Sequence, residues 1–255
     1  MKNFVSGILI FSIMCMPSFA SLVSHWELNE TTGTSGSNSV AGAAPIDFYG
    51  TVSDSNWVPG KIGNAVKLNG SDGNYLLIKS GSVYDFGGFE DMTIALWVKF
   101  DSIPTVPSVC YLWDNTYSGY KSNLVIVGGE QIRIQSAQGD ATGPTGWFDS
   151  NAWHHIAFIA RNTDDGLCDF EVFVDGESYV TKTDLDRDTT GRLGWAAFGA
   201  NAAVNGVGAN YLSGAIDDIR FYDTALSAAD VQSLVPEPVT FAMLALGALV
   251  LYRKR

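Results

Sequence analysis

The strongest constraint on the fold is the alternation of apolar and polar residues in short runs. Apolar side chains take every second position in residues 94–100, 124–126, 132–134, 156–158 and 170–174, and residues 216–222 are predicted to form another strand. A period of two is the pattern of a β-strand with one buried face. Turn residues separate the runs, and Asp175-Gly176 has the sequence of a two-residue hairpin turn. We therefore predict an all-β protein, an antiparallel two-sheet β-sandwich of the jelly-roll type.

One short helix is predicted behind the last of these strands. Ser227 and Asp230 have the spacing of a capping box, and Val231 and Leu234 give the helix an apolar side. Pro236 ends it. Neither a fixed repeat nor a long linker divides residues 21–235, so we expect one domain there. Its loosest stretch, residues 31–44, is rich in Gly, Ser and Asn and is predicted to be a loop.

The charge balance limits the partners of this domain. The chain of 255 residues holds 27 acidic and 15 basic residues, a net charge of −12. Four of the basic residues lie at the two ends, so residues 21–235 are more acidic still. Binding to duplex nucleic acid depends on Lys and Arg contacts with phosphates, so we exclude it. Carboxylates and carbonyls instead suit a hard cation such as calcium.

Residues 1–20 are predicted to be a secretory signal peptide. Lys2 precedes a mostly apolar stretch over residues 4–16, and the small residues Ser18 and Ala20 stand where signal peptidase needs them. The protein is therefore expected to be exported. Export leaves Cys110 and Cys168 in an oxidising compartment, where they either pair or stay as two buried thiols.

The last twenty residues have three parts in a fixed order. Pro236-Glu237-Pro238 is followed by an apolar run over residues 239–252 and by three basic residues. As a helix the run would span about 21 Å of a ~30 Å hydrocarbon core, so as a membrane anchor it would be short. The order resembles the PEP-CTERM sorting signal. The resemblance implies an exosortase-type sorting enzyme, transient anchoring in the inner membrane and a final place on the surface or outside of a Gram-negative bacterium.

The domain itself resembles the laminin-G-like, concanavalin A-like jelly-roll family of exported proteins. Several segments carry the resemblance in the order of the family. They are residues 24–30 (SHWELNE), 60–70 (GKIGNAVKLNG), 92–99 (MTIALWVK), 153–157 (WHHIA), 172–176 (VFVDG) and 214–222 (GAIDDIRFY). The resemblance implies two antiparallel sheets packed face to face. Members of the family are mostly binding modules, and some are glycanases.

The resemblance also implies a structural calcium ion between the first-strand region and the last strand. Here that position corresponds to Asn29, Glu30, Asp217 and Asp218, although related proteins often have Asp where Asn29 stands. The alternative for Asp217 and Asp218 is hydrogen bonding or pairing with Arg220. Calcium is thus a predicted structural cofactor.

Nothing in the sequence supports catalysis, and we predict that the protein is not an enzyme. Laminarinase-like jelly rolls need a tight Glu-x-Asp-x-x-Glu strand that brings two carboxylates to about 5.5 Å, and no Glu has that spacing here. His154 and His155 are adjacent on one strand, so they point to opposite faces and cannot bind one ion together. We predict a structural role for both.

Exposed aromatic rings are the best candidates for ligand contact, because the apolar face of a sugar stacks on them. Trp113 and Trp147 lie near loops, and we predict them at a ligand-binding edge. The first hypothesis is a non-catalytic, lectin-like module that binds glycan at the cell surface or in a biofilm matrix. The second is a structural or protein-binding surface domain without a sugar site. The third, disfavoured, is a glycan-degrading enzyme.

Overall fold

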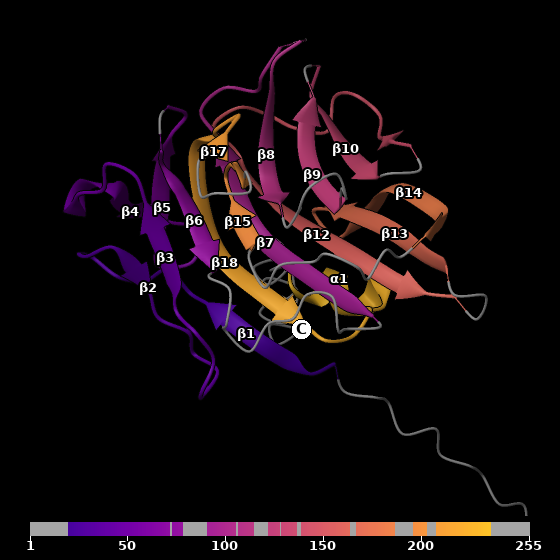
Figure 1. Cartoon of the computed structure of the whole chain (residues 1–255), viewed down its shortest axis with the longest axis horizontal. Coiled ribbons are helices and arrows are strands. Elements are labelled where there is room, and N and C mark those ends of the chain that lie inside the picture. The colour runs from indigo at the N-terminus through magenta and orange to yellow at the C-terminus, as the bar shows by residue number, and fades with distance from the viewer. Residues whose placement is uncertain are drawn as a thin grey trace, which may run out of the picture.

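The chain folds into two antiparallel sheets that face each other across a shared core (Figure 1). The computed structural model describes residues 20–71, 73–78, 91–105, 107–114, 122–127, 129–136, 139–163, 167–186, 196–202 and 208–235. The sorting motif Pro236, Glu237 and Pro238, the apolar tail and residues 1–19 of the predicted leader lie outside these ranges. Among the described residues, no helix has the length and apolarity that a membrane crossing requires.

Sheet A holds eight strands of the described chain. Their order is β14 (Glu177–Asp186), β13 (Leu167–Val174), β12 (Trp153–Asn162), β7 (Met92–Phe100), β18 (Ser213–Tyr222), β5 (Asn64–Asn69) and β4 (Trp57–Pro59), and β1 (Leu22–Trp26) also pairs with β18. The long central strands β7, β12 and β18 contain three of the segments that the sequence predicts as strands. The Asp175-Gly176 turn joins β13 to β14, and both of its residues have positive φ, as a tight hairpin turn requires.

Sheet B also holds eight strands. Their order is β11 (Ala141–Thr142), β10 (Gln131–Ser136), β9 (Ser122–Val127), β8 (Val109–Asp114), β15 (Ala196–Phe198), β6 (Tyr75–Ile78), β3 (Ile46–Tyr49) and β2 (Ser35–Gly36). A small ribbon of β16 (Asn201–Ala202) and β17 (Gly208–Ala209) and a 3-10 turn, η1 (Asp54–Asn56), complete the strand-rich part. The predicted antiparallel two-sheet sandwich is confirmed.

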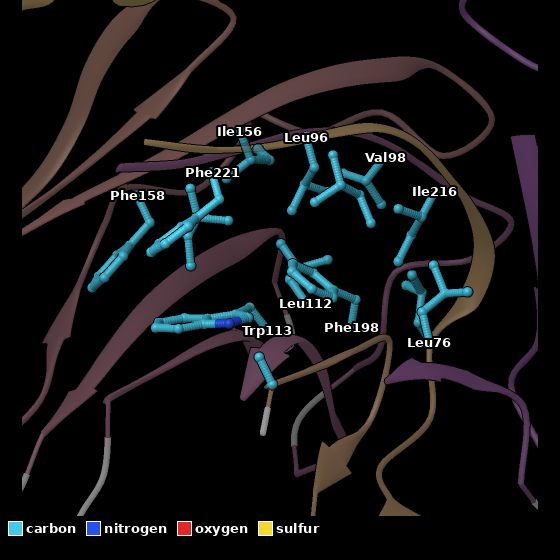
Figure 2. Packing of buried hydrophobic residues seen from close by; sticks show 14 of the residues in the cluster. Leu76, Leu96, Val98, Leu112, Trp113, Ile156, Phe158, Phe198, Ile216 and Phe221 are labelled. Atoms are coloured by element: carbon cyan, nitrogen blue, oxygen red, sulfur yellow. The ribbon is translucent and has the colours of Figure 1, made fainter. Parts of the chain in front are cut away.

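Alternate residues of both sheets meet in one continuous core. Ile94, Leu96 and Val98 of β7 point inward with Ile156 and Phe158 of β12, and all are at most 1% exposed. Figure 2 shows Leu96, Val98, Ile156 and Phe158 opposite four side chains of sheet B, Leu76, Leu112, Trp113 and Phe198. Burial of so many large apolar side chains is the main stabilising term of such a sandwich.

The outer face of sheet A is partly covered by the predicted helix, α1 (Ala228–Ser233). Ser227 caps it and exchanges hydrogen bonds with Asp230, so the predicted capping box is confirmed. Val231 packs with residues of the outer face, among them Ala95 and Ala157. The helix therefore covers one end of this face. The turn at residues 60–63 lies over another part of it, where Lys61 contacts the Trp97 ring.

Cys110 and Cys168 are both buried and neither forms a disulfide. They belong to the shared core, Cys110 on β8 and Cys168 on β13. Of the two alternatives left open by the sequence, the structure has the pair of buried thiols.

Candidate functional site

Three of the predicted calcium ligands gather around the turn at residues 60–64, where they accept hydrogen bonds. Asp217 Oδ2 accepts the backbone N–H groups of Lys61 (2.7 Å) and Ile62 (2.9 Å). Asn29 Oδ1 accepts the Asn64 N–H at 2.9 Å, and the Asn64 side chain donates to the carbonyls of Asn29 and Glu30. These residues therefore clasp the first-strand region and β18 to one turn.

Two glycines of the 60–70 segment, Gly60 and Gly63, are required by close contacts at this turn. A Cβ atom at Gly63 would lie 2.0 Å from Asn29 Oδ1, and one at Gly60 would lie 2.5 Å from Asp217 Oδ2. Gly63 also has φ +71°, a conformation that disfavours other residues. The motif thus allows the polar side chains of distant strands to approach the backbone of the turn.

Asp218 is committed to two basic side chains. Its Oδ1 lies 2.5 Å from His25 Nε2, and its Oδ2 accepts from Arg220 at 3.0 Å. Burial opposes its ionisation, but these contacts outweigh burial and hold the pKa of Asp218 below its usual value. The alternative of pairing with Arg220 is confirmed. Asp218 has a φ of +49° and lies at a bulge in β18 between Asp217 and Arg220. The bulge lets the Asp218 side chain turn toward His25.

The four residues as arranged do not form a calcium cage. Calcium takes six to eight oxygen ligands, whereas most oxygens here accept N–H or O–H donors, including Glu30 Oε1 from Ser37. Among the described residues, no group of three or more His, Cys, Asp or Glu side chains is placed to hold a metal ion. Calcium binding stays a prediction of the sequence.

The two adjacent histidines point to opposite faces of β12, as expected. His154 Nε2 accepts the Asp149 N–H at 3.1 Å, so its proton lies on Nδ1, which donates to Asp175 Oδ2 at 2.8 Å. This bond and the His155 N–H keep the pKa of Asp175 low despite burial. Because both nitrogens of His154 are engaged, this histidine fastens a turn and is not placed as an acid or base.

Trp113 lies in the core, which corrects its predicted place at a ligand-binding edge. Its ring is fully buried and packs 5.3 Å from Phe158 (Figure 2). The pairing of β8 with β9 shifts between Tyr111 and Trp113, so Leu112 and Trp113 both join the core. The ring is therefore not available to a ligand.

Trp147, the other predicted contact, is only partly buried. It follows the loop of residues 143–146 at the edge where β11 of sheet B approaches β14 of sheet A. Its ring meets Tyr179 edge-on, with 5.2 Å between the ring centroids. The Tyr179 hydroxyl donates to Pro144 O (2.6 Å) and accepts the Ile132 N–H (3.1 Å).

Further contacts fix the loop that carries Trp147. The Gly143 N–H donates to Ile132 O at 3.0 Å, and Gln131 Nε2 donates to Gly143 O at 2.7 Å. A Cβ atom at Gly143 would lie 2.1 Å from the Tyr179 ring, so only glycine fits there. The loop before Trp147 is thus fixed to β10 and to Tyr179, and the partly buried Trp147 ring also packs against the core.

A polar row that the sequence did not reveal crosses the outer face of sheet A. His155, Trp97 and Asp217 are direct neighbours on β12, β7 and β18, and all are at most 2% exposed. Burial lowers the pKa of His155 to about 4 and raises that of Asp217 to about 6. Lys61 of the turn lies over the Trp97 ring, 4.4 Å from its centroid.

The family model for the concanavalin A-like lectin/glucanases superfamily, Laminin_G_3, matches residues 69–232. The chain belongs to this superfamily. The superfamily includes both lectins and glucanases by its own description, so membership alone does not separate binding from catalysis. No curated protein matches the chain significantly.

Solved structures confirm the superfamily fold. Domain 4 of AbnA, a GH43 extracellular arabinanase from Geobacillus stearothermophilus solved with arabinotriose, shares 21% identity at a TM-score of 0.63, over 85% of this chain and 99% of that domain. The receptor-binding domain of botulinum neurotoxin mosaic serotype C/D shares 15% (TM-score 0.62), over 84% of this chain and 50% of that one. A Trypanosoma rangeli sialidase shares 15% (TM-score 0.63), over 84% and 32%.

Proposed function

We propose that the protein is a non-catalytic module that binds glycan through the edge carrying Trp147. The observation that carries this proposal is a partly exposed tryptophan held at the rim by a loop that Tyr179 fixes. An aromatic ring held in place gains contact area with a sugar at little entropic cost. The superfamily and the similarity to a domain solved with arabinotriose support a carbohydrate ligand.

The contacts of two acidic side chains, Glu171 and Asp175, support a non-catalytic role for them. A retaining glycosidase needs two carboxyl groups about 5.5 Å apart, one of them free to give up a proton to the substrate. Glu171 is held by Arg161 (2.7 Å) and by Ser178, and Asp175 is held by His154. These carboxylates fasten strands and turns, a role that removes them from proton transfer.

Affinity electrophoresis through gels that contain arabinan or other neutral polysaccharides tests the binding. We expect one class of polysaccharide to retard the protein and Trp147→Ala to abolish the retardation. Ile62→Ala, which removes an exposed apolar side chain at the turn over sheet A, should be retarded like the wild type. If no gel retards the protein, the glycan proposal fails and a structural or protein-binding surface role takes its place. Reducing ends released from any of these polysaccharides would refute the non-catalytic part.

The proposal places this module outside the cell of a Gram-negative bacterium. Support comes from the sequence alone, from the leader over residues 1–20 and the tail that begins at Pro236-Glu237-Pro238. Expression of the full chain in a Gram-negative host with and without an exosortase tests it. Mass spectrometry should show Ser21 as the first residue in both hosts and loss of the tail only with the exosortase. A tail kept in both hosts would exclude sorting of this kind.

A further inference from the structure

The outer face of sheet A carries two tryptophans, each with a lysine over its ring. Trp97 and Lys99 are two residues apart on β7, so their side chains are neighbours on the same face. Lys61 lies over Trp97, and Lys99 lies over the ring of Trp153, 5.1 Å from its centroid. Both ammonium groups therefore lie on the outer face of sheet A, over two tryptophan rings that belong to the adjacent strands β7 and β12.

Both lysines are free to meet an anion. The ion pairs between the described residues include neither Lys61 nor Lys99. Acidic residues outnumber basic ones 27 to 15 in this chain, yet no carboxylate in the described part of it forms an ion pair with either lysine. Two unpaired cations beside a partly exposed Trp153 offer charge and an apolar surface together.

The row beneath them is polar and incompletely bonded. Trp97 Nε1, His155 Nδ1 and Asp217 Oδ1 are buried and, within the described part of the chain, have no hydrogen-bond partner. Buried polar groups without a partner are rare and costly. Lys61, an exposed and flexible side chain, is one of the groups that cover this row, and its contact with the Trp97 ring is weak enough for a ligand to displace. Hydroxyl groups of a ligand that reached the row would supply the missing partners.

We propose that this face is a second ligand site, specific for a sugar that carries a carboxylate, such as a uronic acid unit. The carboxylate binds the ammonium groups of Lys61 and Lys99, and the apolar face of the sugar ring packs on Trp153. The net negative charge of the protein repels long polyanions, but exposed charges beyond about 8 Å are screened at physiological salt, so the two lysines dominate for a short oligosaccharide. The site is separate from the Trp147 edge.

Titration calorimetry of the full-length protein with trigalacturonate tests the proposal, with a neutral galactose trisaccharide as the matched ligand. We expect binding of trigalacturonate alone, and a Kd at least about tenfold higher in Lys61→Ala and in Lys99→Ala, since each loses a charge-assisted contact. Lys182→Ala on β14 changes the net charge equally at the far edge of sheet A and should bind like the wild type.

The outcomes separate this site from the Trp147 edge. Trp147→Ala should bind trigalacturonate normally. If Trp147→Ala abolishes this binding while the lysine variants keep it, acidic sugar binds at the Trp147 edge, and the outer-face proposal is overturned while the proposed function stands. Equal affinity for the acidic and neutral trisaccharides, or no binding of trigalacturonate, also overturns it, whatever the gels with neutral polysaccharides show.

Discussion

Removal of the Tyr179 hydroxyl separates the support of the Trp147 loop from the tryptophan itself. In Tyr179→Phe the ring and its contacts with Trp147 and Phe148 remain, because phenylalanine keeps the same shape. The Ile132 N–H, which the hydroxyl accepts at 3.1 Å, loses its partner in a residue that is fully buried. Pro144 O loses its donor as well, although this exposed loop residue is open to water.

The expected loss of stability in Tyr179→Phe follows from the buried Ile132 N–H. A buried N–H left without a partner costs about 1–3 kcal/mol. In a domain of this size each kcal/mol lowers Tm by roughly 2–4 °C, so Tyr179→Phe should melt about 2–12 °C below the wild type. The loop also loses its attachment at Pro144, and we expect weaker retardation by the polysaccharide that binds the wild type, since Trp147 must then be ordered on binding.

Differential scanning calorimetry and affinity electrophoresis of the same samples measure both effects. Thr145→Ala, at the exposed tip of the same loop, is the control and should change neither Tm nor retardation. A Tyr179→Phe variant that melts and migrates like the wild type would show that the hydroxyl does not hold the loop, and the argument for a fixed Trp147 would fail.

Four other predictions concern the core, the buried titratable groups and calcium. Phe158→Ala empties a fully buried position and should lower the free energy of unfolding in urea by about 3–5 kcal/mol, against at most about 0.5 kcal/mol for Ile62→Ala, which is 41% exposed. Burial lowers the pKa of His155 from 6.5 to about 4, so the unfolded chain binds the proton first as pH falls and stability decreases between pH 6.5 and 4; this slope should be shallower in His155→Gln. The pKa of Asp175 is lowered, so its ionised carboxylate stabilises the fold above the usual carboxyl pKa of 3.8, and this stabilisation is lost as pH falls below that value. In Asp175→Asn the free energy of unfolding, measured in urea, should therefore depend less on pH in that acid range. A chelator should leave Tm unchanged if the predicted calcium ligands act as the hydrogen-bonded clasp seen here, whereas a fall of several degrees would show that calcium binds.

The fold was predictable because its local signals agree with its packing. The alternating run of β7 becomes a central strand with Ile94 and Leu96 in the core. The Asp175-Gly176 turn and the Ser227 cap depend on residues a few positions apart, so the sequence shows them directly.

The candidate site was harder to predict, because it depends on contacts between distant segments. The prediction for Trp113 relied on its position near a loop and was wrong, because a shift in strand pairing adds one more inward residue to β8. Lys61 reaches Trp97 from a turn 36 positions earlier in the chain, and no local pattern announces that contact. The prediction for Trp147 rests on a local signal, a tryptophan after a Gly- and Pro-rich loop, whereas no local pattern shows the contact of its ring with Tyr179.

The proposed function depends on glycan binding at the edge carrying Trp147. Its most direct test is titration calorimetry of the wild type and Trp147→Ala with the neutral polysaccharide that retards the wild type most. We predict measurable binding by the wild type and none by Trp147→Ala at the same concentrations, with the two proteins melting at nearly the same temperature. Equal binding by both proteins would contradict the account, because the sugar would then bind somewhere other than this edge.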